Sequence, residues 1–226
     1  MRRTDGHGAI DDYVAGLGRR LVGPARLKAE LLAEARDGLT DAAEAHEAGG
    51  LDPAAARRRA IDEFGGYAAV APAYQVELAA AQGRSTALIL AAALVALRLV
   101  APLVWSGGDV AWVASLVGAF DTLAVAGALG AGAILLAYGP AGRRLGDPVR
   151  LTRLVGRSTL VFLAVHGLAG VLVMASVAVR APAAFAWPPA LGVAVAMWLG
   201  YGFAARCAWR CLRAARPELV AEPTPG

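Results

Sequence analysis

The stretch TALILAAALVALRLVAPLVW, residues 86–105, decides how this chain folds. It carries one charged side chain, Arg98, and nearly all its other residues are apolar. A helix of about twenty residues, rising 1.5 Å per residue, is as long as the ~30 Å hydrocarbon core of a bilayer is thick. Backbone polar groups find no water there and must bond within the segment. The stretch therefore predicts a transmembrane helix.

The composition extends this prediction to most of the chain beyond residue 85. Hydrophobic residues make up 58% of the 226 residues and aromatic residues only 7%. Small apolar residues of this kind let transmembrane helices pack closely. Four segments are long enough to cross a bilayer: 86–105, 110–138, 159–179 and 189–209. We expect an all-α protein with a four-helix transmembrane bundle over residues 85–211 and a disordered tail over 212–226.

Arginine residues predict the orientation of these spans. The connections 106–109 and 180–188 contain one arginine between them, whereas 139–158 contains five and more follow the fourth span. Arginine is enriched on the cytoplasmic side of short loops, so both termini are expected in the cytoplasm. The scarcity of lysine beside abundant Ala, Arg and Gly is typical of high-GC bacteria. We expect a multi-pass protein in the lipid bilayer of a bacterial inner membrane.

The connection before the third span has two interpretations. Asp147 and Pro148 suit an N-cap and a first helical position, and Arg150, Arg153 and Arg157 then recur on one helical face. Such a segment suits the membrane interface. Alternatively, it is a basic loop whose only task is to set the orientation.

The distribution of charge argues against nucleic-acid binding. The sequence pI is about 9.5. Residues 1–85, however, hold 11 Lys+Arg against 13 Asp+Glu, a formal charge of −2, and residues 86–226 hold 11 against 5, a charge of +6. The basicity belongs to the apolar part, and the polar part has no basic stripe to neutralise phosphates. We expect no direct contact with nucleic acid.

Two charged residues lie where hydrocarbon is predicted. Arg98 and Asp121 fall in the first and second spans, where charges usually pair or face other helices. Because these spans are antiparallel, the depths of the two residues differ by only ~5–8 Å. We predict an Arg98–Asp121 ion pair that clamps the first hairpin. A proton or ion site at Asp121 is less favoured, because no second carboxylate occurs in any span.

Other polar and small residues of the spans have structural interpretations. His166 is expected to be a neutral histidine bonded to a backbone carbonyl rather than a pH sensor. Small residues recur every four positions at Gly118, Thr122, Ala126 and Gly130, and at Gly192, Ala196 and Gly200. These ladders predict helix contacts within the bundle or between copies in a homo-oligomer.

The sequence contains no catalytic motif: no phosphate-binding glycine loop, no nucleophile elbow and no His-Glu helix motif. Cys207 and Cys211 share a helical face, but two thiols do not make a metal site. We expect neither enzyme activity nor a cofactor nor a metal.

Residues 9–84 predict a small cytoplasmic domain of short amphipathic helices, after a disordered start over 1–8. The second helix should stop at Gly49 and Gly50. Asp52 and Pro53 suit the N-cap and first position of the third helix.

The end of the third helix should complete the domain. Ile61 and Phe64 lie three apart on one face and are expected to close the core, and Gly65 should adopt the left-handed αL conformation. A fourth helix, from about Tyr67, should run towards the first span.

Three stretches of this domain together resemble the permease prefix domain, also described as the HAAS type of helical signalling domain. They are IDDYVAGLGRRL (10–21), ARLKAELLAEARDGLTDAAEAHEAGG (25–50) and LDPAAARRRAIDEFGGYAAVAPAYQVELAAAQGRSTAL (51–88). Such domains are fused to permease-type membrane regions or occur in membrane proteins encoded beside PadR-like transcription regulators. The resemblance implies a signalling or docking module.

The expected function follows from this resemblance. The cytoplasmic domain would dock a partner, a PadR-like regulator, and so couple a membrane state to transcription. The alternatives are an accessory or regulatory subunit of a transporter and a passive scaffold. Five residues are candidates either for docking or for the domain core: Tyr13, Leu17, Ile61, Phe64 and Tyr74.

Overall fold

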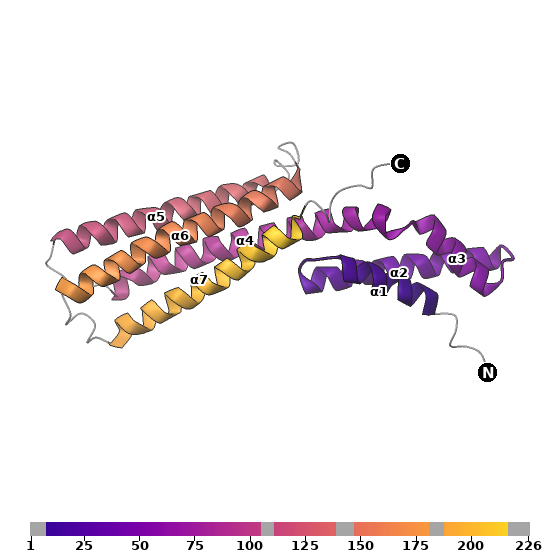
Figure 1. Ribbon diagram of the computed structural model, residues 1–226, viewed down its shortest axis with the longest axis horizontal. Coiled ribbons are helices and arrows are strands. Elements are labelled where there is room, and N and C mark those ends of the chain that lie inside the picture. The colour runs from indigo at the N-terminus through magenta and orange to yellow at the C-terminus, as the bar shows by residue number, and fades with distance from the viewer. Residues whose placement is uncertain (1–7, 105–110, 139–146, 181–187, 217–226) are drawn as a thin grey trace. The chain divides into compact units, whose positions relative to one another are not determined.

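The structure, a computed structural model, describes residues 8–104, 111–138, 147–180 and 188–216. All regular secondary structure in these residues is α-helical, as predicted (Figure 1). The helices are α1 (Gly8–Arg20), α2 (Ala25–Ala48), α3 (Pro53–Phe64), α4 (Tyr67–Val104), α5 (Ala111–Ala137), α6 (Pro148–Arg180) and α7 (Pro188–Ala214).

The chain divides into two compact units. We call residues 1–82 with 213–226 the helical module, and residues 83–212 the apolar unit. Helices α4 and α7 each contribute residues to both units, because α4 passes the boundary at residue 83 and α7 passes it at residue 213.

Local sequence signals define the helix ends of the module. The Asp52 carboxylate accepts hydrogen bonds from the backbone N–H groups of Ala54 and Ala55, at 3.0 and 3.1 Å. Gly49 is the C-cap of α2, and Gly50 follows it at φ 97°. Side-chain capping and glycine at positive φ satisfy backbone groups that a helix leaves open. These helix ends confirm the sequence prediction.

Gly65 departs in part from its prediction. Its φ of 107° is positive as expected, but its ψ of 163° is extended rather than αL. The Gly65 carbonyl accepts a 2.6 Å hydrogen bond from the Tyr13 hydroxyl, which requires it to point towards α1. Only glycine adopts this backbone region readily, so the contact explains the glycine.

Two apolar clusters form the core of the module. The first contains Ile10, Tyr13, Val14, Leu39, Ala43 and Ala60. The second contains Leu17, Leu21, Leu31 and Leu78. Helix α1 supplies residues to both clusters, and the Tyr13 ring stacks on Tyr67 at 4.8 Å and meets the edge of Phe64 at 5.9 Å. Burying α1 therefore holds the other helices of the module together.

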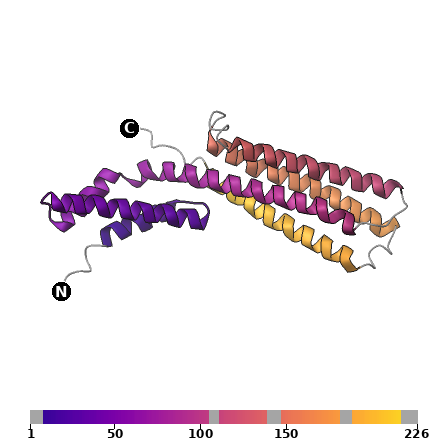
Figure 2. The same ribbon diagram turned by 180° about the vertical axis from the view of Figure 1, so that it is seen from behind.

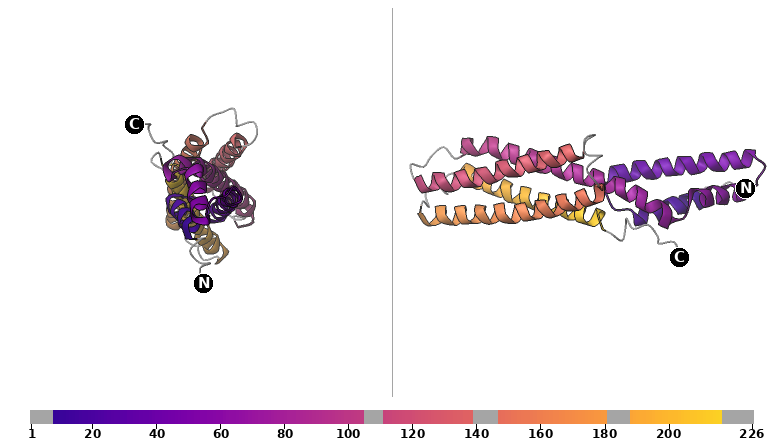
Figure 3. Two further views of the ribbon diagram at one scale, coloured as in Figure 1. Left: turned by 90° about the vertical axis from the view of Figure 1, so that its right-hand side faces the viewer. Right: turned by 90° about the horizontal axis from the view of Figure 1, so that it is seen from above.

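The helices of the apolar unit lie lengthwise beside one another (Figures 2 and 3). Gly127 of α5 lies so close to Phe162 of α6 and Leu94 of α4 that a side chain there would overlap them. Gly156 of α6 is similarly close to Leu212 of α7. Glycine at these two positions permits close helix packing.

Three helices are long and apolar enough to cross a membrane, over Tyr67–Leu99, Gly118–Ala137 and Pro148–Val179. The predicted first three spans lie on these helices. The fourth predicted span lies on α7, which is not among them over its described residues, and it stays a prediction.

Several predicted boundaries are corrected. Residues 148–158 are not a loop, because α6 is continuous from Pro148 to Arg180, and the predicted Asp147 N-cap bonds the Val149 N–H. Their place at a membrane interface stays a prediction. Gly8 begins α1, and α7 continues to Ala214, so disorder was wrongly predicted at these places. Residues 1–7 and 217–226 lie outside the described residues.

The small-residue ladders do not make the predicted contacts inside the bundle. The space beside Gly118, Gly130, Gly192 and Gly200 is open: apart from the local helix backbone, no heavy atom of the described residues lies within 4 Å of the position that a Cβ would take. Thr122, Ala126 and Ala196 are exposed. Contacts between copies stay a prediction.

Candidate functional site

The five docking or core candidates belong to the core of the module. Tyr13 and Leu17 are buried, with exposed fractions of 7% and 0%. Ile61, Phe64 and Tyr74 are partly buried against the two apolar clusters. The structure therefore favours the core interpretation for all five.

Tyr13 is placed by its rings and its hydroxyl. Burial, followed by the nearby Tyr67 and Tyr74, raises the pKa of Tyr13 above its ordinary value. Its neutral hydroxyl donates to the Gly65 carbonyl. Tyr13 therefore ties α1 to the turn between α3 and α4.

A polar cleft of about 210 Å³ lies between α1, α2 and α3. Its lining residues are Ile10, Asp11, Arg36, Thr40, Ala43, Glu44, Glu47 and Arg57. Arg36 pairs with Asp11 at 2.9 Å, and Arg57 lies 3.6 Å from Glu47. Glu44 is exposed and makes no ion pair with the described residues. The cleft therefore offers one uncompensated carboxylate between two ion pairs.

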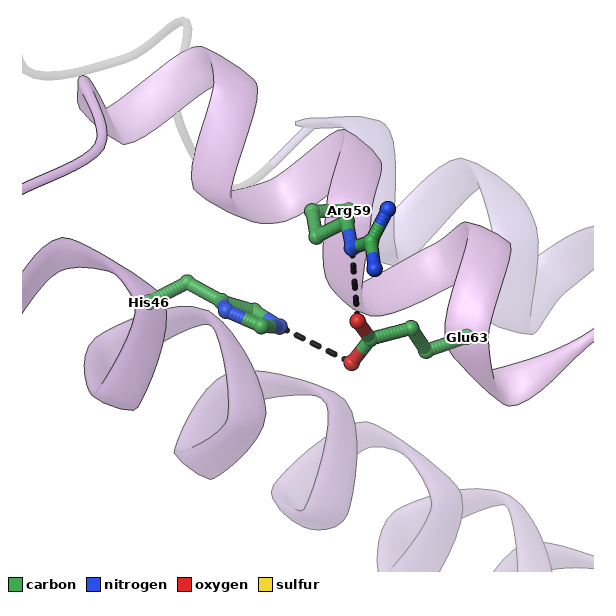
Figure 4. A network of polar contacts seen from close by, with 3 residues as sticks. All are labelled: His46, Arg59 and Glu63. Carbon is green, nitrogen blue, oxygen red and sulfur yellow. Dashed lines mark hydrogen bonds and ion pairs between the residues drawn. The ribbon is translucent and has the colours of Figure 1, made fainter. Parts of the chain in front are cut away.

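A second polar network ties the end of α2 to α3 (Figure 4). His46 Nε2 lies 3.0 Å from Glu63 Oε2, and Arg59 Nε donates to Glu63 Oε1 at 2.6 Å. Arg59 first, and His46 second, hold the pKa of Glu63 below its ordinary value. All three side chains are partly exposed, so the network is a structural tie rather than a reactive centre.

Gln75 of α4 is a buried polar side chain of the module, with an exposed fraction of 1%. Its Oε1 accepts from the Val22 N–H at 2.9 Å. Its Nε2 donates to the carbonyls of Val22, at 2.7 Å, and of Ala214, at 2.8 Å. One amide thus joins the turn after α1, the first part of α4 and the end of α7.

In the apolar unit, the structure brings Arg98 and Asp121 together. Arg98 Nε of α4 lies 3.1 Å from Asp121 Oδ1 of α5. The two side chains are 50% and 33% exposed, so the pair lies at the edge of the helix contact. Its stabilising role stays a prediction.

Polar contacts also link the other neighbouring helices of the apolar unit. Tyr138, directly after α5, shares a 2.8 Å hydrogen bond with Thr152 of α6. The Cys211 thiol of α7 donates to the Thr86 hydroxyl of α4 at 3.1 Å. With the Arg98 pair, these contacts tie α4 to α5, α5 to α6 and α7 to α4.

His166 supplies the remaining link, between α6 and α7. It is fully buried, its ring lies against Phe120 and Phe162, and its Nδ1 is hydrogen-bonded to the Tyr201 hydroxyl. Nδ1 therefore bonds a side chain, while the Phe120 backbone lies close enough to His166 to act as the predicted backbone partner. Nε2 has no hydrogen-bond partner among the described residues.

The two cysteines and the possible metal-ligating side chains were placed as follows by the fold. Cys207 and Cys211 are both buried and not joined by a disulfide. Within residues 8–104, 111–138, 147–180 and 188–216, no group of three or more His, Cys, Asp or Glu side chains is placed to hold a metal ion.

Sequence reasoning missed three features of these sites: Gln75, the His166–Tyr201 contact and the polar cleft. Each joins residues far apart in the chain, such as Gln75 and Ala214. One signal was present for Gln75: it lies seven residues before the buried Gln82, on the same stripe of α4. Polar residues repeated on a buried stripe indicate a bonded partner.

Comparisons of the chain with protein-family models, with curated proteins and with solved structures find no match.

Replacing Gln75 by Leu should loosen two distant parts of the module together. The change leaves the Val22 N–H and two carbonyls without partners, and each buried unpaired group costs about 1–3 kcal/mol. Hydrogen exchange of the full chain in detergent should become faster both near Val22 and near Ala214. Glu77→Gln, at an exposed position of α4, is the control. Faster exchange at only one of the two places would contradict the shared link.

Replacing Asp121 by Asn should weaken the contact between α4 and α5. Polar contacts between membrane helices contribute about 0.5–1.5 kcal/mol, so we expect a lower melting temperature in detergent. A double-mutant cycle with Arg98→Gln isolates the pair. An unchanged melting temperature for Asp121→Asn would refute the clamp.

The Glu63 network should make the module sensitive to acid. Because the folded-state pKa of Glu63 lies below its ordinary value of 4.5, its contribution is complete above pH 4.5 and is lost as the pH falls through the lowered value. As the pH is lowered below 4.5, the loss of protection against hydrogen exchange at the end of α2 should therefore be smaller in the Glu63→Gln variant than in the unaltered chain. The neighbouring variant Asp62→Asn should keep the original acid response, and equal responses would refute the assignment.

Proposed function

We propose that this chain is an integral membrane signalling protein of a bacterial inner membrane, whose helical module docks a cytoplasmic transcription regulator of the PadR-like kind. In this proposal α7 is a fourth span, and both termini lie in the cytoplasm. The resemblance of residues 8–88 to permease prefix domains and the arginine distribution support these finer points.

The observation that carries the proposal is the bonding of Gln75. Both α4 and α7 have apolar stretches in the apolar unit and ends in the module. Gln75 bonds the end of α7 to Val22, in the turn between α1 and α2. A rotation or shift of the end of α7 would therefore disturb the start of α2, which is what a signalling protein requires.

The polar cleft is the proposed docking surface. Its wall on α2 includes Arg36 and Glu44, so a displaced α2 would alter the cleft. Glu44 is the uncompensated carboxylate there, and the partner is expected to offer a cationic side chain to it. Rim charges of this kind govern association rate and choice of partner. The buried Tyr13 and Leu17 would then act indirectly, by holding α1 at the cleft.

The test is co-purification of the detergent-solubilised full chain with the product of a neighbouring gene for a PadR-like regulator. Glu44→Arg reverses the charge in the cleft and should weaken binding by about ten-fold, the equivalent of one strong polar contact. Glu34→Arg makes the same change at an exposed position of α2 outside the cleft and should bind normally. Equal binding by the two variants would refute the cleft as the docking surface. Co-purification with an ATPase instead would favour the transporter subunit.

A further inference from the structure

The apolar unit contains a cavity of about 270 Å³ between α4, α6 and α7. Its walls include Leu94 and Leu97 of α4, Phe162 of α6, and Met197, Gly200 and Tyr201 of α7. No charged side chain lines it among the described residues.

Small residues create this space. Ala196, Gly200 and Ala204 lie four residues apart along the cavity side of α7. Elsewhere in the unit, Gly127 and Gly156 permit tight contact with a neighbouring helix. Gly200 has no such neighbour, since no atom lies within 4 Å of the position that a Cβ would take. Its small size therefore leaves room instead of bringing helices together.

The chemistry of the walls excludes water as the occupant. An ordered buried water needs two to four polar partners. The Tyr201 hydroxyl is the polar side-chain group of the described lining, and it is already bonded to His166. Residues on the same helices as the cavity, Val95, Leu99, Leu199 and Phe203, are between 51% and 71% exposed. Side chains of this kind face lipid in a membrane helix, so hydrocarbon surrounds the opening.

We propose that this cavity is a binding site for a single acyl chain of a membrane phospholipid. A flexible chain of methylene groups matches the apolar side chains that α4, α6 and α7 contribute to the walls. Each buried methylene contributes favourably to binding. This inference needs only that the helices lie in a bilayer, and it is independent of the docked partner.

The experiment uses the full chain in vesicles that contain a phospholipid with a photoreactive diazirine on one acyl chain. After irradiation, peptide mapping measures labelling at Leu94 and Met197 in the cavity and at Leu129, which is 70% exposed on α5. Cavity residues should be labelled more than Leu129. Gly200→Phe should reduce cavity labelling by about ten-fold, as expected when about two methylene groups lose their site, and leave Leu129 unchanged.

The matched control is Gly130→Phe, because Gly130 is also open within 4 Å but lies outside the cavity on α5. It should keep full labelling at Leu94 and Met197. If Gly200→Phe misfolds by circular dichroism, Ala196→Leu fills the same cavity with a smaller side chain. Labelling of the cavity no greater than that of Leu129, or unaffected by both filling variants, would overturn the proposal. Labelling by a photoreactive free fatty acid but not by the phospholipid would also overturn it.

Discussion

The rest of this structure depends on one constraint: polar groups in an apolar environment must form hydrogen bonds or ion pairs within the protein, because no water is there to replace them. Long apolar helices meet it for the backbone, because every central N–H and C=O bonds within its own helix. The side chains meet it between helices. Polar contacts join α4 to α5 through Arg98, α5 to α6 through Tyr138, α6 to α7 through His166, and α7 to α4 through Cys211. The same groups that are costly in an apolar medium thus specify which helices are neighbours.

The module meets the same constraint with fewer apolar residues. Its two clusters depend on α1, and Tyr13 adds a hydrogen bond to Gly65, which has an extended ψ at positive φ. Gln75 extends this bonding to the end of α7. Helix α7 therefore has two structural roles. Its middle lines an apolar cavity, and the Ala214 carbonyl at its end is hydrogen-bonded to Gln75 of the module. The end of α7 is thus joined through Gln75 to the turn between α1 and α2.

Local signals were sufficient for much of the fold. Asp52 and Asp147 cap helices because their side chains reach N–H groups only two or three residues ahead. Arg98 and Asp121 could be matched because a short connection and the helical rise restrict their relative depth. His166 could not be matched with Tyr201, since 35 residues separate them and the facing of α6 and α7 depends on the packing of the whole unit. The partners of the small-residue ladders could not be predicted for the same reason: spacing shows which residues share a helical face but not what that face meets.

By itself, then, the sequence determined that the described residues are helical and where most helices of the module begin and end. Of the four spans it predicted, three lie on helices that are long and apolar enough to cross a membrane. These properties depend on neighbours within one or two helical turns, or on composition summed along a segment. Only the tertiary structure decided that Tyr13 and Leu17 belong to the core and that Gln75 is hydrogen-bonded to Ala214. It alone also decided that Gly200 lines a cavity, whereas Gly127 lies in close contact with neighbouring helices. Those outcomes depend on which helical faces meet, and that choice is made by packing and by pairing of buried polar groups across the whole chain.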